Sequence, residues 1–174
     1  MADLNGKNVA IIATNGFEDS ELTSPKEAVE SAGATTKVIS TETGEIEGKK
    51  GAKVAVDAKT ADASVDEFDA LILPGGTINA DTIRTDADAV ALVKAFKDAS
   101  KPIGVICHGG WILADADLLK GVKLTSVANV KTDLANAGAN WVDEEVVVDS
   151  GFISSRTPDD LPAFNATLVE EFAK

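Results

Sequence analysis

The stretch Lys101–Leu119, KPIGVICHGGWILADADLL, combines a predicted strand, a sharp corner and a predicted helix. Its first part ends in the apolar run IGVI, which predicts a buried strand, because such runs are typical of strands covered on both faces. A helix is predicted from Gly109 onward, so Cys107 and His108 occupy the corner. A strand that passes directly into a helix is the repeating unit of α/β proteins, and this stretch therefore indicates that fold class.

Other segments repeat the same strand pattern. They are NVAIIAT (8–14), TTKVIST (35–41) and FDALILPGG (68–76), and helical patterns separate them. Strands that alternate with helices favour a parallel sheet with helices on both faces. We therefore predict an α/β three-layer sandwich with a mostly parallel central sheet, formed as a single domain over residues 1–174.

Cap and turn residues predict the remaining elements. In the first helix, Ser24 is the predicted N-cap, Pro25 lies in the first turn and Gly33 ends the helix. In the last helix, Thr157 is the predicted cap and Pro158 lies in the first turn. The other predicted elements are a helix over 86–99, two short strands at a sheet edge within 45–60, and late strands at 123–126, 144–149 and 152–155.

The composition excludes several classes of function. The net charge of −13 opposes binding to nucleic acid, and no basic stripe offsets it. No apolar run approaches the roughly 20 residues that a membrane helix needs. The start of the chain, MADLNGKNVAII, lacks the pattern of a signal peptide. We therefore expect no nucleic-acid partner and no membrane association.

The single cysteine and single histidine bear on compartment and cofactors. One cysteine cannot form an internal disulfide, so a reducing cytoplasm is the expected location. Cys107 and His108 are adjacent, and this spacing is not that of a zinc site. We expect neither a metal nor an organic cofactor.

Candidate site residues follow three of the predicted strands. The loops are TNGFEDSE (14–21), PGGTINAD (74–81) and CHGG (107–110). Ligands of open α/β sheets bind at the carboxyl ends of the strands, so these loops are expected to meet around one site. A cysteine where a helix begins can become a nucleophilic thiolate, although a free cysteine is more often an inert buried side chain.

The neighbours of Cys107 have possible roles as well. His108 must be the base of any Cys–His mechanism, and it then needs an orienting carboxylate from another loop or another subunit. The glycines Gly75, Gly76 and Gly109 let the backbone approach a ligand and are candidates for an oxyanion hole or substrate contacts. A carboxyl group close to the thiol in a partly dry pocket would have a raised pKa. Among the three acids of GFEDSEL, we expect Asp19 and Glu21 to be solvated.

The motifs together resemble one family. GFEDSEL, FDALILPGG, PIGVICHGGWIL and GANWVDEEVVVDSGFISSRTPDDLPAF occur in this order over nearly the whole chain. This order is similar to that of the PfpI-type intracellular proteases, within the superfamily of the parkinsonism-associated deglycase and the class I glutamine amidotransferase-like fold. The resemblance implies a flavodoxin-like sandwich and a homodimer or homohexamer.

The resemblance also implies roles for individual residues. Cys107 is the implied nucleophile on an elbow, and His108 is its implied histidine. The glutamate of GFED, Glu18, is the implied hydrogen-bond partner of the cysteine. An acidic residue after LPGG completes a Cys–His–acid triad from a neighbouring subunit, and Asp81 is its best counterpart, although an ungapped count reaches Ala80 instead.

Three functions are compatible with these residues. The first is a cysteine-dependent stress-response hydrolase, a deglycase or glyoxalase acting on a small dicarbonyl such as methylglyoxal or on its protein or nucleotide adducts. The second is an intracellular cysteine peptidase. The third is a redox-sensing or chaperone-like stress protein without turnover. Glutamine-dependent ammonia transfer is excluded, because the amidotransferases use a histidine far downstream of the cysteine and this chain has none after His108.

Overall fold

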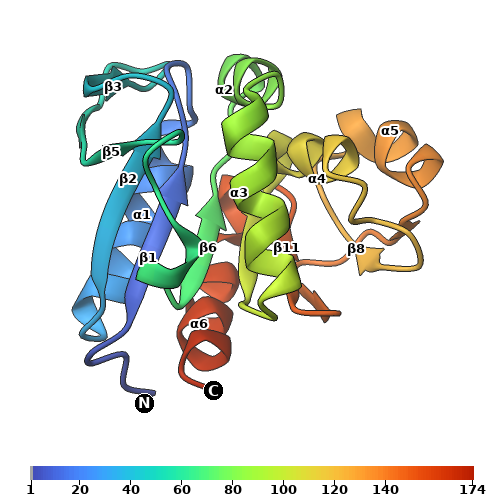
Figure 1. Ribbon diagram of the computed structural model, residues 1–174. Helices are drawn as coiled ribbons and strands as arrows, with labels where there is room; N and C mark the ends of the chain where they lie inside the picture. The colour runs from blue at the N-terminus through green and yellow to red at the C-terminus, as the bar shows by residue number, and fades with distance from the viewer. Residues whose placement is uncertain (1) are drawn as a thin grey trace.

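A computed structural model describes residues 2–174 and contains a seven-stranded sheet between layers of helices (Figure 1). The strand order is β10-β11-β7-β6-β1-β2-β5, and every neighbouring pair is parallel except β10 and β11. The strands of this sheet are β1 (Asn8–Ile12), β2 (Thr35–Ser40), β5 (Ala58–Lys59), β6 (Ala70–Leu73), β7 (Ile103–Ile106), β10 (Val147–Asp149) and β11 (Phe152–Ser155). The predicted α/β fold with a mostly parallel central sheet is confirmed.

Two smaller sheets and the helices complete the fold. The hairpin of β3 (Gly44–Glu47) and β4 (Lys53–Val56) forms one small sheet, and β8 (Lys123–Leu124) with β9 (Asn140–Trp141) forms the other. The α-helices are α1 (Asp19–Ser31), α2 (Thr77–Ile83), α3 (Ala87–Asp98), α4 (Trp111–Asp115), α5 (Lys131–Asn136) and α6 (Leu161–Phe172). Short 3₁₀ turns cover Val65–Glu67, Cys107–Gly110, Ala128–Val130 and Pro158–Asp160.

The alternation of side chains along each central strand produces a core on both faces of the sheet. In β1, Ala10 and Ile12 pack with Phe96 of α3, whereas Val9 and Ile11 belong to the core that α1 and α6 cover. Successive residues of a strand point to opposite faces, so a strand buried on both must be apolar throughout. This requirement explains the unbroken apolar runs in the sequence.

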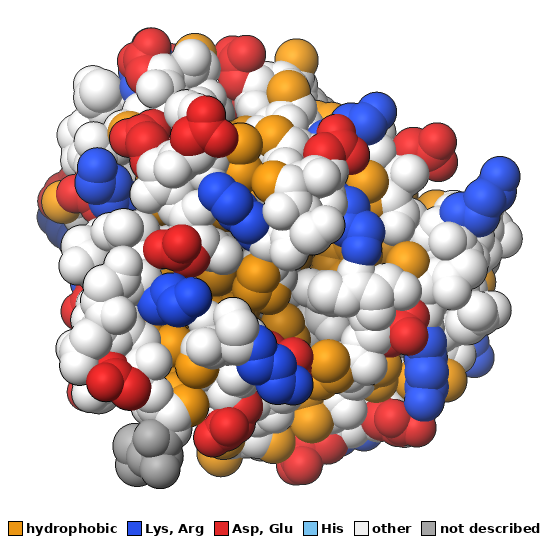
Figure 2. All heavy atoms as spheres, turned by 60° about the horizontal axis from the view of Figure 1, so that its bottom comes forward, with side chains coloured by type: hydrophobic (Ala, Val, Ile, Leu, Met, Phe, Trp, Pro, Cys, Tyr) orange, Lys and Arg blue, Asp and Glu red, His pale blue; other side chains and the backbone are white. Residues whose placement is uncertain are grey.

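The carboxyl ends of β1, β6 and β7 lie at one edge of the sheet, because the three strands are parallel neighbours. This edge carries the loops that follow the three strands, at the top of the view in Figure 1. Figure 2 brings the opposite end forward, with acidic, basic and hydrophobic side chains intermixed and no histidine in view. The candidate residues therefore gather at one end of the molecule.

The first helix begins earlier than predicted. α1 starts at Asp19, with Glu18 as its N-cap residue in extended conformation, and Pro25 lies inside the helix instead of in its first turn. The prediction of Ser24 as the cap was wrong. The additional turn buries Leu22 on the same face as Pro25 and Val29, and this burial offsets the hydrogen bond that proline removes. Gly33, with φ +109°, follows the helix end as predicted.

The last helix also differs in its start. Thr157 precedes a 3₁₀ turn that contains Pro158, but its side chain makes no cap hydrogen bond, and α6 itself begins at Leu161. Proline lacks a backbone N–H and tolerates the first positions of such a turn.

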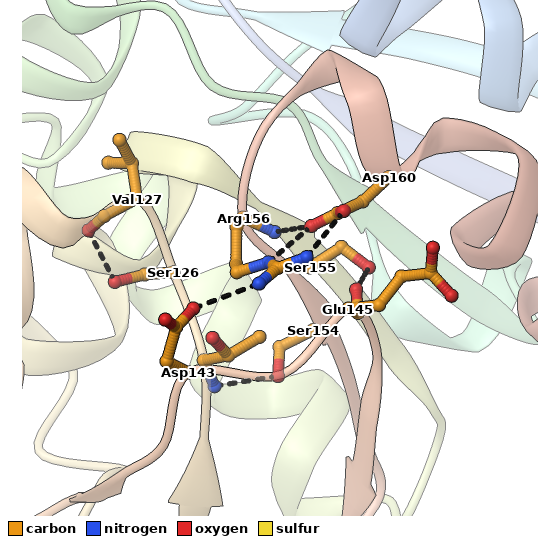
Figure 3. A network of polar contacts seen from close by, with 9 residues as sticks. Ser126, Val127, Asp143, Glu145, Ser154, Ser155, Arg156 and Asp160 are labelled. Carbon is orange, nitrogen blue, oxygen red and sulfur yellow. Dashed lines mark hydrogen bonds and ion pairs between the residues drawn. The ribbon is translucent and has the colours of Figure 1, made fainter.

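Arg156 joins two acidic side chains at the carboxyl end of β11 (Figure 3). The sequence SSRTPDD predicts a local ion pair or cap contact with Asp159 and Asp160. The Arg156 guanidinium donates to both carboxylate oxygens of Asp160, at 2.8 and 2.9 Å, and to Asp143 at 2.9 Å. The partner Asp160 is confirmed, and Asp143, 13 residues upstream, is an additional partner. Hydrogen bonds from Arg156 hold the pKa of Asp160 below its ordinary value.

Replacing Arg156 with alanine should destabilise the protein. The substitution leaves the carboxylate of Asp160, only 3% exposed, without its cation, and we expect the midpoint of unfolding in urea at neutral pH to fall. This loss of stability should become smaller as the pH falls below the ordinary pKa of aspartate, because a protonated Asp160 carries no charge for the guanidinium to pair with. Arg156→Lys keeps the charge and should lose less. Equal stability of the alanine variant and the wild type would contradict the prediction.

Candidate active site

Cys107 occupies the corner between β7 and the 3₁₀ turn that leads into α4, as predicted. Its φ of +60° lies in the left-handed region, which costs a non-glycine residue roughly 1 kcal/mol. The corner is closely packed: a Cβ on Gly75 would lie 2.8 Å from that of Cys107, and a Cβ on Gly109 would lie 2.6 Å from the carbonyl oxygen of Leu73. The thiol is therefore held in a strained and closely packed turn of the kind that presents a nucleophile.

Glu21, in the first turn of α1, is the carboxyl group that neighbours the thiol. Its side chain is fully buried, and Oε1 accepts the N–H of Gly75 at 3.0 Å. Oε2 has no hydrogen-bond partner of its own within residues 2–174. Burial raises the pKa of Glu21 to about 7, and the negative charge of Glu18 adds to this rise.

The thiol and the carboxyl group affect each other's ionisation. Burial raises the pKa of Cys107, and the negative charge of Glu21 raises it further, while the backbone N–H of His108 opposes the rise. The thiolate is thus favoured when Glu21 carries a proton. Near neutral pH the pair can exchange a proton with a substrate, which is the behaviour expected of a general acid–base group.

This geometry corrects the assignment of Glu18 as the glutamate that hydrogen-bonds Cys107. The carboxylate of Glu18 forms ion pairs with Lys49 and, at 3.0 Å, with Lys50, and these two side chains lower its pKa against the effect of burial. The expectation that Glu21 is solvated was also wrong. Glu21 shares the buried face of α1 with Leu22, Pro25 and Val29, at helical spacing.

His108 contacts both the thiol and α2. Its Nδ1 lies 3.4 Å from Cys107 Sγ, and its Nε2 lies 3.3 Å from Thr77 Oγ1. The ring of Trp111 packs edge-on against the imidazole, with 5.4 Å between centroids. Burial, aided by the charge of Lys49, lowers the pKa of His108, so the neutral ring is favoured. A neutral ring with its proton on Nε2 donates to Thr77 and leaves Nδ1 free to accept the thiol proton.

Asp81 does not complete a triad within one chain. It lies exposed on α2 and forms no hydrogen bond or ion pair with His108 in residues 2–174, while the hydroxyl of Thr77 occupies the Nε2 side of the ring. Any role for Asp81 requires a second subunit, as the resemblance implied.

The predicted oxyanion donors are not equivalent. The N–H of Gly75 is committed to Glu21, so the prediction for Gly75 as an oxyanion donor was wrong. Gly76 adopts φ +92° ahead of α2, and its N–H has no hydrogen-bond partner in the described part of the chain. Gly109 is buried in the turn beside Cys107. Gly76 is therefore the stronger candidate for stabilising a developing negative charge.

Replacing Thr77 with valine should misorient His108. The variant removes the acceptor for Nε2–H, and we expect alkylation of Cys107 by iodoacetamide near neutral pH to slow by about fivefold, the effect of one hydrogen bond. Thr77→Ser keeps the hydroxyl and should react at the wild-type rate. A valine variant with unchanged rate and unchanged imidazole ¹⁵N chemical shifts would show that Thr77 does not orient the ring.

The described residues, 2–174, contain no group of three or more His, Cys, Asp or Glu side chains arranged to hold a metal ion. No helix in this range is both long and apolar enough to cross a membrane.

Comparison with known proteins identifies the family. The sequence model of the DJ-1/PfpI family matches residues 7–171, nearly the whole chain. The chain belongs to the DJ-1/PfpI family. The resemblance drawn from the motifs is therefore confirmed.

Other members of the DJ-1/PfpI family are similar over their full length. An uncharacterized protein of Staphylococcus saprophyticus is 52% identical over 168 residues, which cover 95% of this chain and 97% of the relative. A Bacillus subtilis relative, YraA, is 46% identical over 160 residues, covering 91% and 94% of the two chains, and its name carries a provisional assignment as a cysteine protease. The crystal structure of a ThiJ/PfpI domain protein from Brachyspira murdochii superposes with a TM-score of 0.89 at 29% identity. The superposition covers 98% of this chain and 97% of the other.

Proposed function

We propose that the protein is a cysteine-dependent glyoxalase or deglycase that acts on methylglyoxal or on its adducts. The observation that supports this most is the placement of the thiol between two proton-transfer groups. Glu21, with a pKa of about 7, neighbours Cys107 on one side, and Nδ1 of His108 lies 3.4 Å away on the other. A 2-oxoaldehyde needs a nucleophile and two proton transfers for its conversion to a 2-hydroxy acid.

The proposed reaction begins with addition. The Cys107 sulfur forms a bond to the aldehyde carbon of methylglyoxal, and the carbonyl electron pair moves to oxygen, which takes a proton to give a hemithioacetal. The Gly76 N–H is suited to stabilise the developing oxyanion.

Isomerisation and hydrolysis follow. One of the two proton-transfer groups, Glu21 or His108, removes the proton from C1. The C2 oxygen gains a proton, and the product is an enediol. Protonation at C2, with loss of the proton from the C1 hydroxyl group, then leaves a thioester at C1. Water attacks the thioester, the carbon–sulfur bond breaks, and lactate leaves. C1 is oxidised and C2 is reduced within one molecule, so the sequence consumes only water.

A peptidase is the second candidate. The name of the Bacillus subtilis relative favours it, and Asp81 is exposed on α2 where a neighbouring subunit could present or receive it. Ile78, on the same helix, is 65% exposed, which is unusual for a large apolar side chain and favours contact between copies. In this reading Cys107, His108 and the partner subunit's Asp81 form the triad of a dimer or hexamer.

A redox sensor is less well supported. Oxidation and nucleophilic addition both require the thiolate, but the two proton-transfer groups beside Cys107 serve a turnover reaction and are not needed by a sensor.

The proposed function is tested by following methylglyoxal by ¹H NMR in D₂O. Formation of lactate with deuterium at C2 is expected, because the enediol takes its C2 proton from exchangeable groups. No lactate above the buffer rate would overturn the proposal. Cleavage of a fluorogenic peptide in its place would support the peptidase, and selective gain of oxygen at Cys107 under mild peroxide would support the sensor.

A further inference from the structure

The turn of the β3–β4 hairpin is fixed against the loop that carries Glu18. The N–H of Lys49 donates to the carbonyl of Phe17 at 2.9 Å, and the carboxylate of Asp19 accepts the N–H groups of Lys50 and Ala52 at 3.0 and 2.8 Å. Figure 1 shows this hairpin at the same end of the molecule as α2. The two lysines of the turn therefore have defined positions relative to the candidate active site.

The ammonium groups of Lys49 and Lys50 share one carboxylate and remain exposed to solvent. Both side chains pair with the single carboxylate of Glu18, which is 7% exposed, whereas the side chains of Lys49 and Lys50 are 48% and 69% exposed. The carboxylate of Asp19 lies against the same turn, but its oxygens accept backbone N–H groups, so within the described residues Glu18 is the carboxylate that pairs with the two ammonium groups. Ammonium groups exposed in this way can form further contacts with an incoming anion without leaving Glu18.

The ammonium group of Lys49 lies close enough to the reactive groups to act on their charges. Burial raises the pKa of Cys107 and of Glu21, and the charge of Lys49 opposes that rise; burial lowers the pKa of His108, and the charge of Lys49 adds to that effect. The backbone provides the physical connection, because the N–H of Glu18 donates to the carbonyl of Gly75 at 3.2 Å, and Gly75 in turn binds Glu21. A substrate whose carbonyl lies at Cys107 would thus have the lysines beside it.

We propose that Lys49 and Lys50 form a carboxylate-recognition subsite that selects 2-oxoaldehydes with an anionic tail over neutral ones. The substrate class rests on the proposed function. The thiolate attacks the aldehyde as before, while the tail carboxylate exchanges solvent for the two ammonium groups. Glu18 holds both lysines and partly neutralises them.

Turnover of two substrates with the same reacting group tests the substrate class. Methylglyoxal is neutral, and 4,5-dioxopentanoate carries a carboxylate and would give 2-hydroxyglutarate. The ratio of kcat/KM for the anionic over the neutral substrate should fall by about tenfold in Lys49→Gln/Lys50→Gln, the effect of one charge-assisted contact. An unchanged ratio would overturn the assignment.

Alkylation of Cys107 tests the subsite without turnover. Iodoacetate and iodoacetamide react with the same thiolate but differ by one negative charge, so their rate ratio cancels any change in the thiol pKa. The ratio of iodoacetate to iodoacetamide should fall by about fivefold in the double glutamine variant and rise in Glu18→Gln, which releases both ammonium groups. Lys53→Gln, on β4 and without an ion pair in the described chain, is the matched control and should keep the wild-type ratio.

The two experiments separate the two proposals. If neither substrate is converted but the alkylation ratio changes as expected, the subsite stands and the proposed function falls. If the ratio in the double variant equals that of Lys53→Gln, or Glu18→Gln lowers it, the subsite falls. All these lysine side chains lie at the surface, and far-UV circular dichroism checks that each variant is folded.

Discussion

Replacing Cys107 with alanine is expected to reduce the conversion of methylglyoxal to lactate by a factor of at least about 1000. Every intermediate of the proposed reaction is bonded to the sulfur, and neither Glu21 nor His108 can substitute for it as the nucleophile. The fold should persist, because alanine and cysteine tolerate the left-handed backbone of position 107 to a similar degree.

The measurement is the initial rate of lactate formation, with unfolding in urea as the check on stability. Cys107→Ser is the second variant, since it retains the shape of the side chain but lacks a nucleophile of comparable strength. An alanine variant that keeps a tenth of the wild-type rate would rule out covalent catalysis by Cys107, whatever else the protein does.

Glu21→Gln is expected to change how stability depends on pH. The folded pKa of Glu21, about 7, lies above the ordinary value of 4.5, so its contribution is fully present below pH 4.5 and is lost as the pH rises through about 7. The loss amounts to roughly 3 kcal/mol, from about 1.4 kcal/mol for each pKa unit. Glutamine has no such titration, so the variant should become the more stable protein on the alkaline side.

Glu18→Gln should change the pH dependence with the opposite sign, and it also removes the charge that adds to the rise in the pKa of Glu21. The pKa of Glu18 is lowered, so its contribution is present above the ordinary value and is lost as the pH falls, which is the opposite sign. Urea unfolding of the wild type and both variants across this pH range measures the two slopes. Parallel curves for Glu21→Gln and the wild type would show that Glu21 is not a buried titrating group.

The same variants report on the thiol. Removing the negative charge of Glu21 should lower the pKa of Cys107, which the ultraviolet absorbance of the thiolate follows. The change in Glu18→Gln should be smaller, because Glu18 is paired with Lys49 and Lys50. Equal shifts in the two variants would contradict the assignment of Glu21 as the immediate neighbour.

The fold was accessible from the sequence because its central strands are buried on both faces. The runs that became β1, β6 and β7 had to be apolar throughout, and Cys107 directly follows the last of them. Family resemblance supplied the family and the functional hypotheses. Local cap signals were less reliable, since Ser24 and Pro25 resemble a helix start but lie in the middle of α1.

That error also explains the misplaced glutamate. With the helix starting at Ser24, Glu21 falls in a loop and has no defined direction. With the helix starting at Asp19, Glu21 faces the core with Leu22 and Val29. Lys49 carried no local signal, because its position beside the site depends on a hairpin that meets the loop only through contacts distant in sequence.

The left-handed backbone at Cys107 limits which side chains could replace the thiol at this position. A β-branched side chain is rarely accommodated at φ +60°, so threonine is disfavoured at position 107 by the backbone alone. Serine meets no such barrier. Replacement of Cys107 by serine is therefore compatible with the backbone of this corner, whereas replacement by threonine is disfavoured, although both side chains carry a hydroxyl group.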